Sequence, residues 1–182
     1  KLLVVNKGIS PSWDAQEKDP KAHTNKSNLM VMDLKTGELL KKVELHDQSH
    51  EIAVSRDQKT AVIPHFVWTV PEHGRQAGSA VTVLDLETDQ QHLINLPGYT
   101  GAHGLEWIDD DHVAVTVDAH EPETQKSFIL ELNVRTRTLE RAIPTKQDES
   151  HLVRLSHDKQ TYFVSDLEGR FTAIDRKSGE VK

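Results

Sequence analysis

The stretch HEIAVSRDQKTAV, residues 50–62, decides the fold, because it reads as two short strands joined by a turn. After His50 comes an apolar run, then the polar segment 55–59, then a second apolar run from Thr60. Polar clusters that contain Asp between two apolar runs predict hairpin turns. The same order returns twice along the chain, in HGLEWIDDDHVAV (103–115) and HLVRLSHDKQTYF (151–163). The sequence therefore predicts a repeated structural unit.

Each unit continues with a third strand that ends in a recurring tag. The four copies are VMDLKTG (31–37), VLDLETD (83–89), ELNVRTR (131–137) and AIDRKSG (173–179). A strand end that closes on Gly, Asp or Arg indicates a tight turn. Fourth strands are expected over 39–45, 91–96 and 139–143, and residues 1–5 read as the second strand of an earlier unit. The expected units span about 1–45, 50–96, 103–143 and 151–182, within one domain over 1–182.

The spacing between corresponding residues is nearly constant. Three pairs are each 15 residues apart, namely His50 and His65, His103 and Asp118, and His151 and Asp166. Only the segment between the second and third strands varies, from 9 to 27 residues. Four strands and a period of about 42 to 53 residues predict an all-β fold, a β-propeller of four-stranded antiparallel blades. The alternative is an ordinary β-sandwich with accidental similarity, which the three equal spacings disfavour.

Two stretches also resemble a known repeat family. HEIAVSRDQKTAV resembles the HEVAVSPDGKTAYV run of the YVTN-type propeller repeats, and VTVLDLET (81–88) resembles their ISVIDLAT. The chain departs from that pattern at Arg56, at Gln58 and over 107–111. The resemblance implies a seven-bladed propeller, a bacterial and extracytoplasmic (periplasmic or secreted) protein, and relatives that include lactonase-like enzymes.

Counting strands gives about four units in this chain, of which two are complete and the first and last are cut. A closed propeller needs at least about four blades, and the resemblance implies more. The remaining blades are therefore expected from the same longer chain, or from a second copy.

Composition narrows the functional classes. The chain has 182 residues, 36% hydrophobic and 28% charged, which is typical of a globular protein. It has no cysteine, so a disulfide framework, a thiolate metal site and a cysteine nucleophile are excluded. The formal net charge of −7 argues against nucleic acid as a partner. No apolar run approaches the roughly 20 residues of a transmembrane segment.

The variable loops and a set of polar residues are expected on one face. In a propeller blade the start of the first strand and the loop after the second strand lie together at the channel mouth, and loops on a rigid scaffold carry binding residues. The catalytic candidates are His65, His50, His103 and Asp118, and the ligand-binding candidates are Asn6, Trp13, Phe66, Trp68, His120, His151 and Asp166. Imidazole and carboxylate suit a divalent metal or acid–base chemistry, and the sequence leaves the cofactor open.

Each candidate also has a structural interpretation. A His repeated in every unit is typical of a residue that bonds the neighbouring backbone, and Asp118 and Asp166 fit strand caps made by Asx turns. His65 carries more functional weight, because Asn or Asp stands there in the other units.

Three hypotheses follow, in order of preference. The first is a scaffold that binds a small ligand or a protein partner on the loop-rich face. The second is a lactonase-like hydrolase or lyase that uses His and Asp. The third is redox work on a bound metal or a haem partner.

Overall fold

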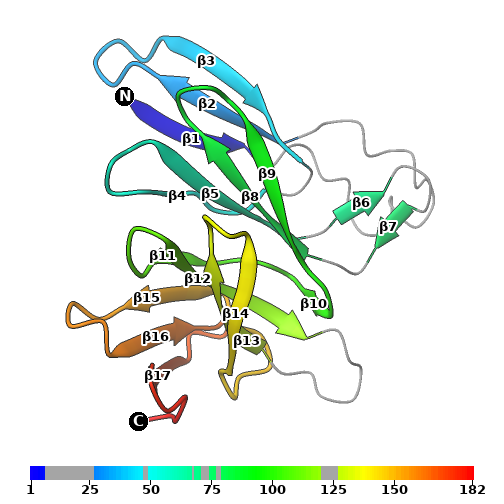
Figure 1. Ribbon diagram of the computed structural model, residues 1–182, viewed down its shortest axis with the longest axis vertical. Helices are drawn as coiled ribbons and strands as arrows, with labels where there is room; N and C mark the ends of the chain where they lie inside the picture. Colours follow the sequence, from blue (N-terminus) through cyan, green and yellow to red (C-terminus); the bar gives the residue numbers. More distant parts are fainter. Residues whose placement is uncertain (7–26, 47–48, 67, 71–73, 77–78, 120–126) are drawn as a thin grey trace.

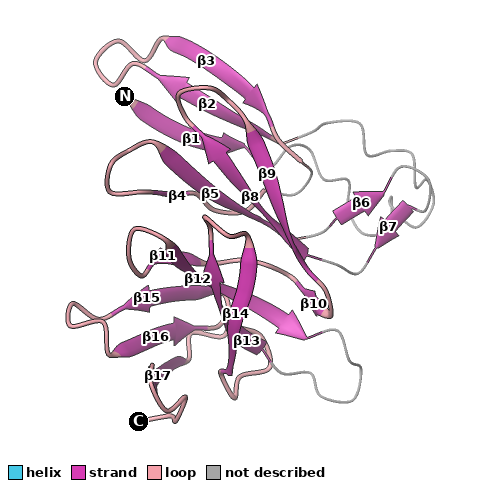
Figure 2. Ribbon diagram, in the orientation of Figure 1, coloured by secondary structure: helices cyan, strands magenta, loops and turns pink. Residues whose placement is uncertain are grey.

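The structure is a computed structural model that describes residues 1–6, 27–46, 49–66, 68–70, 74–76, 79–119 and 127–182. The described residues form only strands, turns and loops, as Figure 2 shows. None of their segments is a helix that could cross a membrane.

Besides one two-stranded hairpin, the described residues form four antiparallel sheets that follow one another in chain order, from the N-terminus at the top of Figure 1 to the C-terminus at the bottom. The first sheet contains β1 (Leu2–Asn6), β2 (Asn28–Met32) and β3 (Leu39–Glu44). The second contains β4 (Ala53–Val54), β5 (Thr60–His65), β8 (Ser79–Asp85) and β9 (Gln91–Leu96). The third contains β10 (Tyr99–Thr100), β11 (Leu105–Trp107), β12 (His112–Ala119), β13 (Ser127–Asn133) and β14 (Thr138–Pro144). The fourth contains β15 (Leu152–Leu155), β16 (Thr161–Ser165) and β17 (Phe171–Asp175).

The recurring tags form the turns that the sequence predicts. The Asp85 side chain accepts hydrogen bonds from the backbone N–H groups of Glu87 and Thr88, at 2.9 and 2.7 Å. Asp33, Asn133 and Asp175 make the same pair of bonds two and three residues ahead. These Asx turns satisfy backbone donors where each third strand ends. They explain why Asp or Asn stands at that place in all four tags.

The core lies between neighbouring sheets. One cluster joins the first two sheets, including Leu29 and Ile63. A second joins the middle two, including Val83 and Leu130, and a third joins the last two through residues such as Tyr162. Each sheet inside this series is covered on both faces, and burying one large apolar side chain contributes about 2 kcal/mol. The arrangement is a β-propeller-like stack of face-packed sheets.

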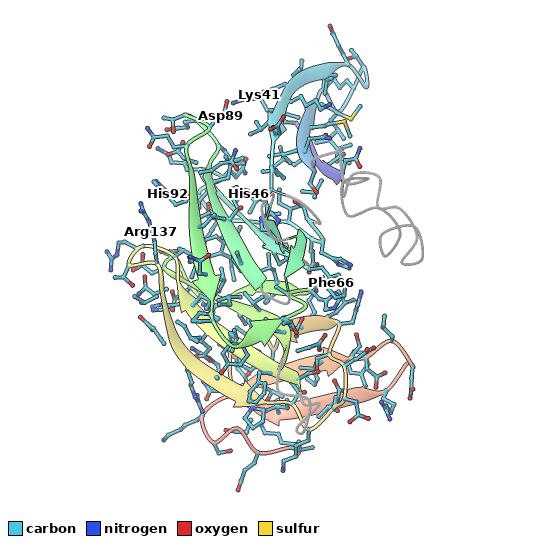
Figure 3. The ribbon with its side chains drawn as sticks, turned by 90° about the vertical axis from the view of Figure 1, so that its right-hand side faces the viewer. Lys41, His46, Phe66, Asp89, His92 and Arg137 are labelled. Atoms are coloured by element: carbon cyan, nitrogen blue, oxygen red, sulfur yellow. The ribbon has the colours of Figure 1, made fainter. Side chains whose placement is uncertain are left out.

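Polar contacts also cross from sheet to sheet. Lys41 of β3 pairs with Asp89 at 2.5 Å, and the two side chains lie together in Figure 3. The Tyr162 hydroxyl donates to Glu131 Oε1 at 2.8 Å, and Arg176 Nε donates to the same oxygen at 2.8 Å. Burial beside Glu131 raises the pKa of Tyr162 well above its usual range. These bonds fix how adjacent sheets pack, because the two partners of each bond come from neighbouring sheets.

The structure confirms the all-β prediction and places most predicted strands within two residues of their expected bounds. The first strands are shorter than expected, and β4 has only two residues. Two further elements were not predicted: the hairpin of β6 (Trp68–Val70) with β7 (Gly74–Gln76), and β10 beside the end of β12.

Candidate functional site: three histidines at the loop end of the sheets

Each sheet has two different ends. At the turn end lie the hairpin turns 55–60 and 85–90 of the second sheet and their counterparts. At the opposite end, which we call the loop end, β5 finishes at His65 and β8 begins at Ser79. His50, His65, Phe66, His103, Asp118, His151 and Asp166 lie toward this loop end.

The segments that lead into β4, β11 and β15 bring three imidazoles together at the loop end. We call His50, His103 and His151 the three-histidine cluster. Their backbone N–H groups donate to carbonyl oxygens near the ends of the second strands, at Pro64 (3.1 Å), Thr116 (2.9 Å) and Ser165 (2.7 Å). The repeat therefore holds each histidine at an equivalent place in its own sheet.

The three rings are close and are not stacked in parallel. Ring centroids are 4.8 Å apart for His50 and His103, 4.9 Å for His103 and His151, and 5.4 Å for His50 and His151. One ring nitrogen from each residue lies within 4.8 Å of the other two. All three residues are half-buried. The three histidines that precede the first strands therefore meet at one place on the loop end.

Phe66 packs against the cluster. Its ring centroid lies 4.5 Å from that of His103 and 6.0 Å from that of His50. Figure 3 labels Phe66 near the junction of the second and third sheets. Gly101 leaves the necessary space, because a Cβ there would lie 2.5 Å from Asp118 Oδ2 and 3.3 Å from Phe66 Cε2. Its φ of +62° also favours glycine.

Asp118 stands beside the cluster at the end of β12. Its Oδ2 is 4.0 Å from His103 Nε2, and its Oδ1 accepts a hydrogen bond from the Ser127 hydroxyl at 3.1 Å. Burial raises the pKa of Asp118 to about 6, and the nearby Glu149 carboxylate acts in the same direction. The carboxyl group therefore changes charge near neutral pH.

A close backbone approach sets the distance between the third and fourth sheets. A Cβ at Gly104 would lie 2.7 Å from the His151 carbonyl oxygen, too close for any side chain. The buried Thr116 hydroxyl bridges the same two segments: it accepts from Gly104 N–H at 2.8 Å and donates to His151 O at 2.9 Å. Gly104 and Thr116 thus position two of the three histidines.

A pocket of about 400 Å³ opens beside Asp118 between the last two sheets. Its lining residues are Asp118, Asp148, Glu149, Asp166, Leu167, Glu168 and Arg170. Five carboxyl groups against one guanidinium give this pocket a negative potential, which attracts cations.

His65 lies in the packed interior and not at the surface. It is 0% exposed, its Nε2 is 2.7 Å from Thr82 Oγ1, and its Nδ1 is 3.5 Å from Ser49 Oγ. A general base must reach a substrate proton, so this burial corrects the functional weight given to His65. A structural role within the second sheet fits these contacts.

Asp166 is a cap, as one interpretation of the sequence had it. Its carboxylate accepts from the backbone N–H groups of Glu168 and Arg170 and pairs with the Arg170 side chain. That side-chain bond lowers the pKa of Asp166.

The other candidates lie apart from the cluster or beyond what can be described. Asn6 ends β1 and is exposed opposite Asn28, one sheet away. Trp68 begins β6. Trp13 and His120 lie outside the described residues.

Sequence reasoning missed Thr116, Ser127, Gly101 and Gly104 as site residues. Thr116 is a polar residue in the otherwise apolar run 113–117, and that contrast was the available signal. Gly101 and Gly104 gave no such sequence signal, because their role depends on the distances between sheets.

The comparisons with known proteins bear on the fold alone. No family model matches the chain, and no curated protein matches it. Among solved structures, the chain is similar to hydrazine synthase from Kuenenia stuttgartiensis, with a TM-score of 0.66 and 11% sequence identity. The match covers 84% of this chain and 46% of that one, so the chain spans about half the length of that neighbour.

Proposed function

We propose that this protein is a propeller scaffold that binds a small ligand at the loop end of its sheets, over the three-histidine cluster. The observation that carries the proposal is the convergence of His50, His103 and His151 from three different sheets, with ring nitrogens within 4.8 Å.

The surroundings of the cluster also support binding. Phe66 supplies an apolar wall against two of the rings, and the acidic pocket beside Asp118 supplies polar groups and volume. Ligand sites in proteins combine these features: a concave surface, an aromatic contact and a few converging polar groups.

The test is a thermal-shift screen with a panel of lactones and small polar metabolites, run without chelator. Compounds that stabilise the wild type should lose that effect in Phe66→Ala. Phe163→Ala is the matched control, because Phe163 is 39% exposed on β16 and lies outside the site. The proposal fails if no compound stabilises the wild type, or if every stabilising compound acts equally on Phe66→Ala.

A second candidate is a lactonase-like hydrolase, which the His103–Asp118 pair favours. An imidazole and a carboxyl group 4.0 Å apart beside an open pocket can share proton transfer to and from a bound ester. Hydrolysis of a lactone panel, followed by acid release, should then be lost in both His103→Ala and Asp118→Asn. Lactone hydrolysis that never exceeds the buffer rate would remove this candidate.

We also propose that further sheets cover the outer faces of the described stack and close a ring, of seven blades by the YVTN resemblance. The residue after each tag Asp or Asn contacts the preceding sheet: Leu86 packs on the core of the first sheet, and Val134 is 9% exposed. Leu34, at the same place in the first sheet, is 70% exposed. Phe171 of the fourth sheet is 72% exposed. Such apolar surface is typical of an interface.

The source of those sheets, a longer chain or a second copy, can be measured. Sedimentation should show that this chain self-associates and that the double variant Leu34→Glu and Phe171→Glu does so less. A monomer with unchanged solubility in both forms would contradict the covered-face proposal. The extracytoplasmic location is likewise a proposal that rests on the resemblance, and cell fractionation tests it.

A further inference from the structure

We infer that the three-histidine cluster is a binding site for one divalent transition-metal ion, held by His50, His103 and His151. This inference rests on the proposed function, because the ion would occupy the same loop end and supply the point where the ligand binds. The chemical class follows from the donors: three imidazoles suit Zn²⁺, Cu²⁺, Ni²⁺ or Fe²⁺, and do not suit Ca²⁺ or Mg²⁺, which prefer oxygen.

The geometry is close to that of a metal site. A tetrahedral ion with metal–nitrogen bonds of about 2.0–2.1 Å separates its ligand nitrogens by about 3.3 Å. The three nitrogens lie within 4.8 Å of one another, so side-chain rotations that move each by roughly 1 Å close the site. The rings are inclined to one another at 88°, 80° and 41°, so none of the three pairs is stacked in parallel.

The backbone around the cluster is held in place, which limits the free-energy cost of bringing the three ring nitrogens onto one ion. Each histidine is anchored through its own N–H to the second strand of its sheet. Gly104 and Thr116 hold the third and fourth sheets together beside His103 and His151. Only side-chain rotations are therefore needed, and a site held this way is already largely organised.

The neighbourhood suits a cation with an open coordination position. Asp118, 4.0 Å from His103, can orient that imidazole from outside the ligand set, as carboxylates do for metal-bound histidines. The acidic pocket on the same side concentrates cations. Three protein ligands leave a fourth position for water or for a ligand atom, which is the pattern of catalytic and ligand-binding zinc sites rather than of structural ones.

The test uses tag-free protein stripped with EDTA and then freed of the chelator. Titration with Zn²⁺ alone should give one ion per chain. Cu²⁺ should give an electron paramagnetic resonance spectrum with hyperfine structure from three nitrogen nuclei. His151→Ala and His50→Ala should each weaken Zn²⁺ binding at least tenfold and reduce the nitrogen count to two.

Two histidine variants away from the cluster serve as controls. His157→Ala removes an exposed imidazole in the turn at the other end of the fourth sheet. His112→Ala removes an imidazole that pairs with Asp109 at 2.7 Å and Glu140 at 3.2 Å, away from the cluster. Both should bind Zn²⁺ as the wild type does. Unfolding curves of the metal-free variants show whether each is folded.

The outcomes separate the two proposals. No Zn²⁺ binding by the wild type, binding that survives His151→Ala, or loss of binding in His112→Ala would each overturn the metal site. If small-molecule binding still depends on Phe66 in that case, the proposed function stands without the ion. If Zn²⁺ binds as expected and the screen finds no Phe66-dependent compound, the metal site stands and the proposed ligand binding fails.

Discussion

Replacing Asp118 with Asn should stabilise the metal-free protein at neutral pH and have little effect in acid. The pKa of Asp118 is raised to about 6 from its usual 3.8, mainly by burial. Below the pKa of Asp118 in the unfolded chain, the carboxyl group is protonated in both the folded and the unfolded state, so it does not lower the folding stability. Between about pH 4 and pH 6 the unfolded chain ionises first, so folding stability falls as the pH rises. Above about pH 6 the loss is complete.

The magnitude follows from the pKa difference. A difference of one in pKa corresponds to about 1.4 kcal/mol, which sets an upper limit of about 3 kcal/mol for ionised Asp118. The Asp118 side chain is 25% exposed, so solvent screens part of the energetic cost of its charge. The expected gain in the free energy of unfolding for Asp118→Asn is therefore about 1–2 kcal/mol. Asn keeps an oxygen that can accept the Ser127 hydroxyl.

The assay is urea unfolding in the presence of EDTA at about pH 4 and about pH 7.5, where the two protonation states dominate. The gain in free energy of unfolding should be present only at the higher pH. Asp158→Asn is the control with the opposite sign, because the hydrogen bond from Ser156 lowers the pKa of Asp158. Equal effects of Asp118→Asn at both pH values, or a loss at about pH 7.5, would refute the reasoning.

Three further changes test the packing around the cluster. Gly104→Ala forces a methyl group against the His151 carbonyl and should cost about 3 kcal/mol or more in thermal or urea unfolding. Thr116→Val leaves two buried backbone groups without their bridge and should cost about 2–3 kcal/mol, whereas Thr116→Ser should cost less than half of that. Tyr162→Phe removes the donor to Glu131 and should cost about 1–2 kcal/mol, with an unchanged Zn²⁺ affinity because it lies outside the site.

Most of the fold could be predicted from the sequence, because the turns of each repeat depend only on residues that are close together in the chain. The Asx turn at Asp85 and its counterparts needs only residues two and three positions ahead, so it appears as a tag in the sequence. The hairpin β6–β7 has no counterpart among the described residues of the other units. The position of β10 is set by its pairing with Asp118 and Ala119. No local sequence pattern predicts this pairing.

The candidate site was predictable in part. Equivalent positions in a repeat lie at the same end of each sheet, so three converging histidines could be expected. His65 could not be assigned, since residues 61–65 of β5 are all buried and the usual alternation that tells inside from outside is lost. The contacts of Phe66 and Thr116 depend on how closely two sheets approach.

The turn end of the sheets contains positions where substitution could raise the stability of the protein. Gly37 and Gly179 close their tags with a positive φ, and Arg137 takes the same turn conformation at +62° without being glycine. Gln58 and Lys159 do likewise in the first hairpins, at +62° and +61°. A left-handed conformation costs a non-glycine residue about 1 kcal/mol. Glycine in place of Gln58, Arg137 or Lys159 should therefore raise the melting temperature without changing any residue of the three-histidine cluster, which makes the turn end the natural place to thermostabilise this scaffold.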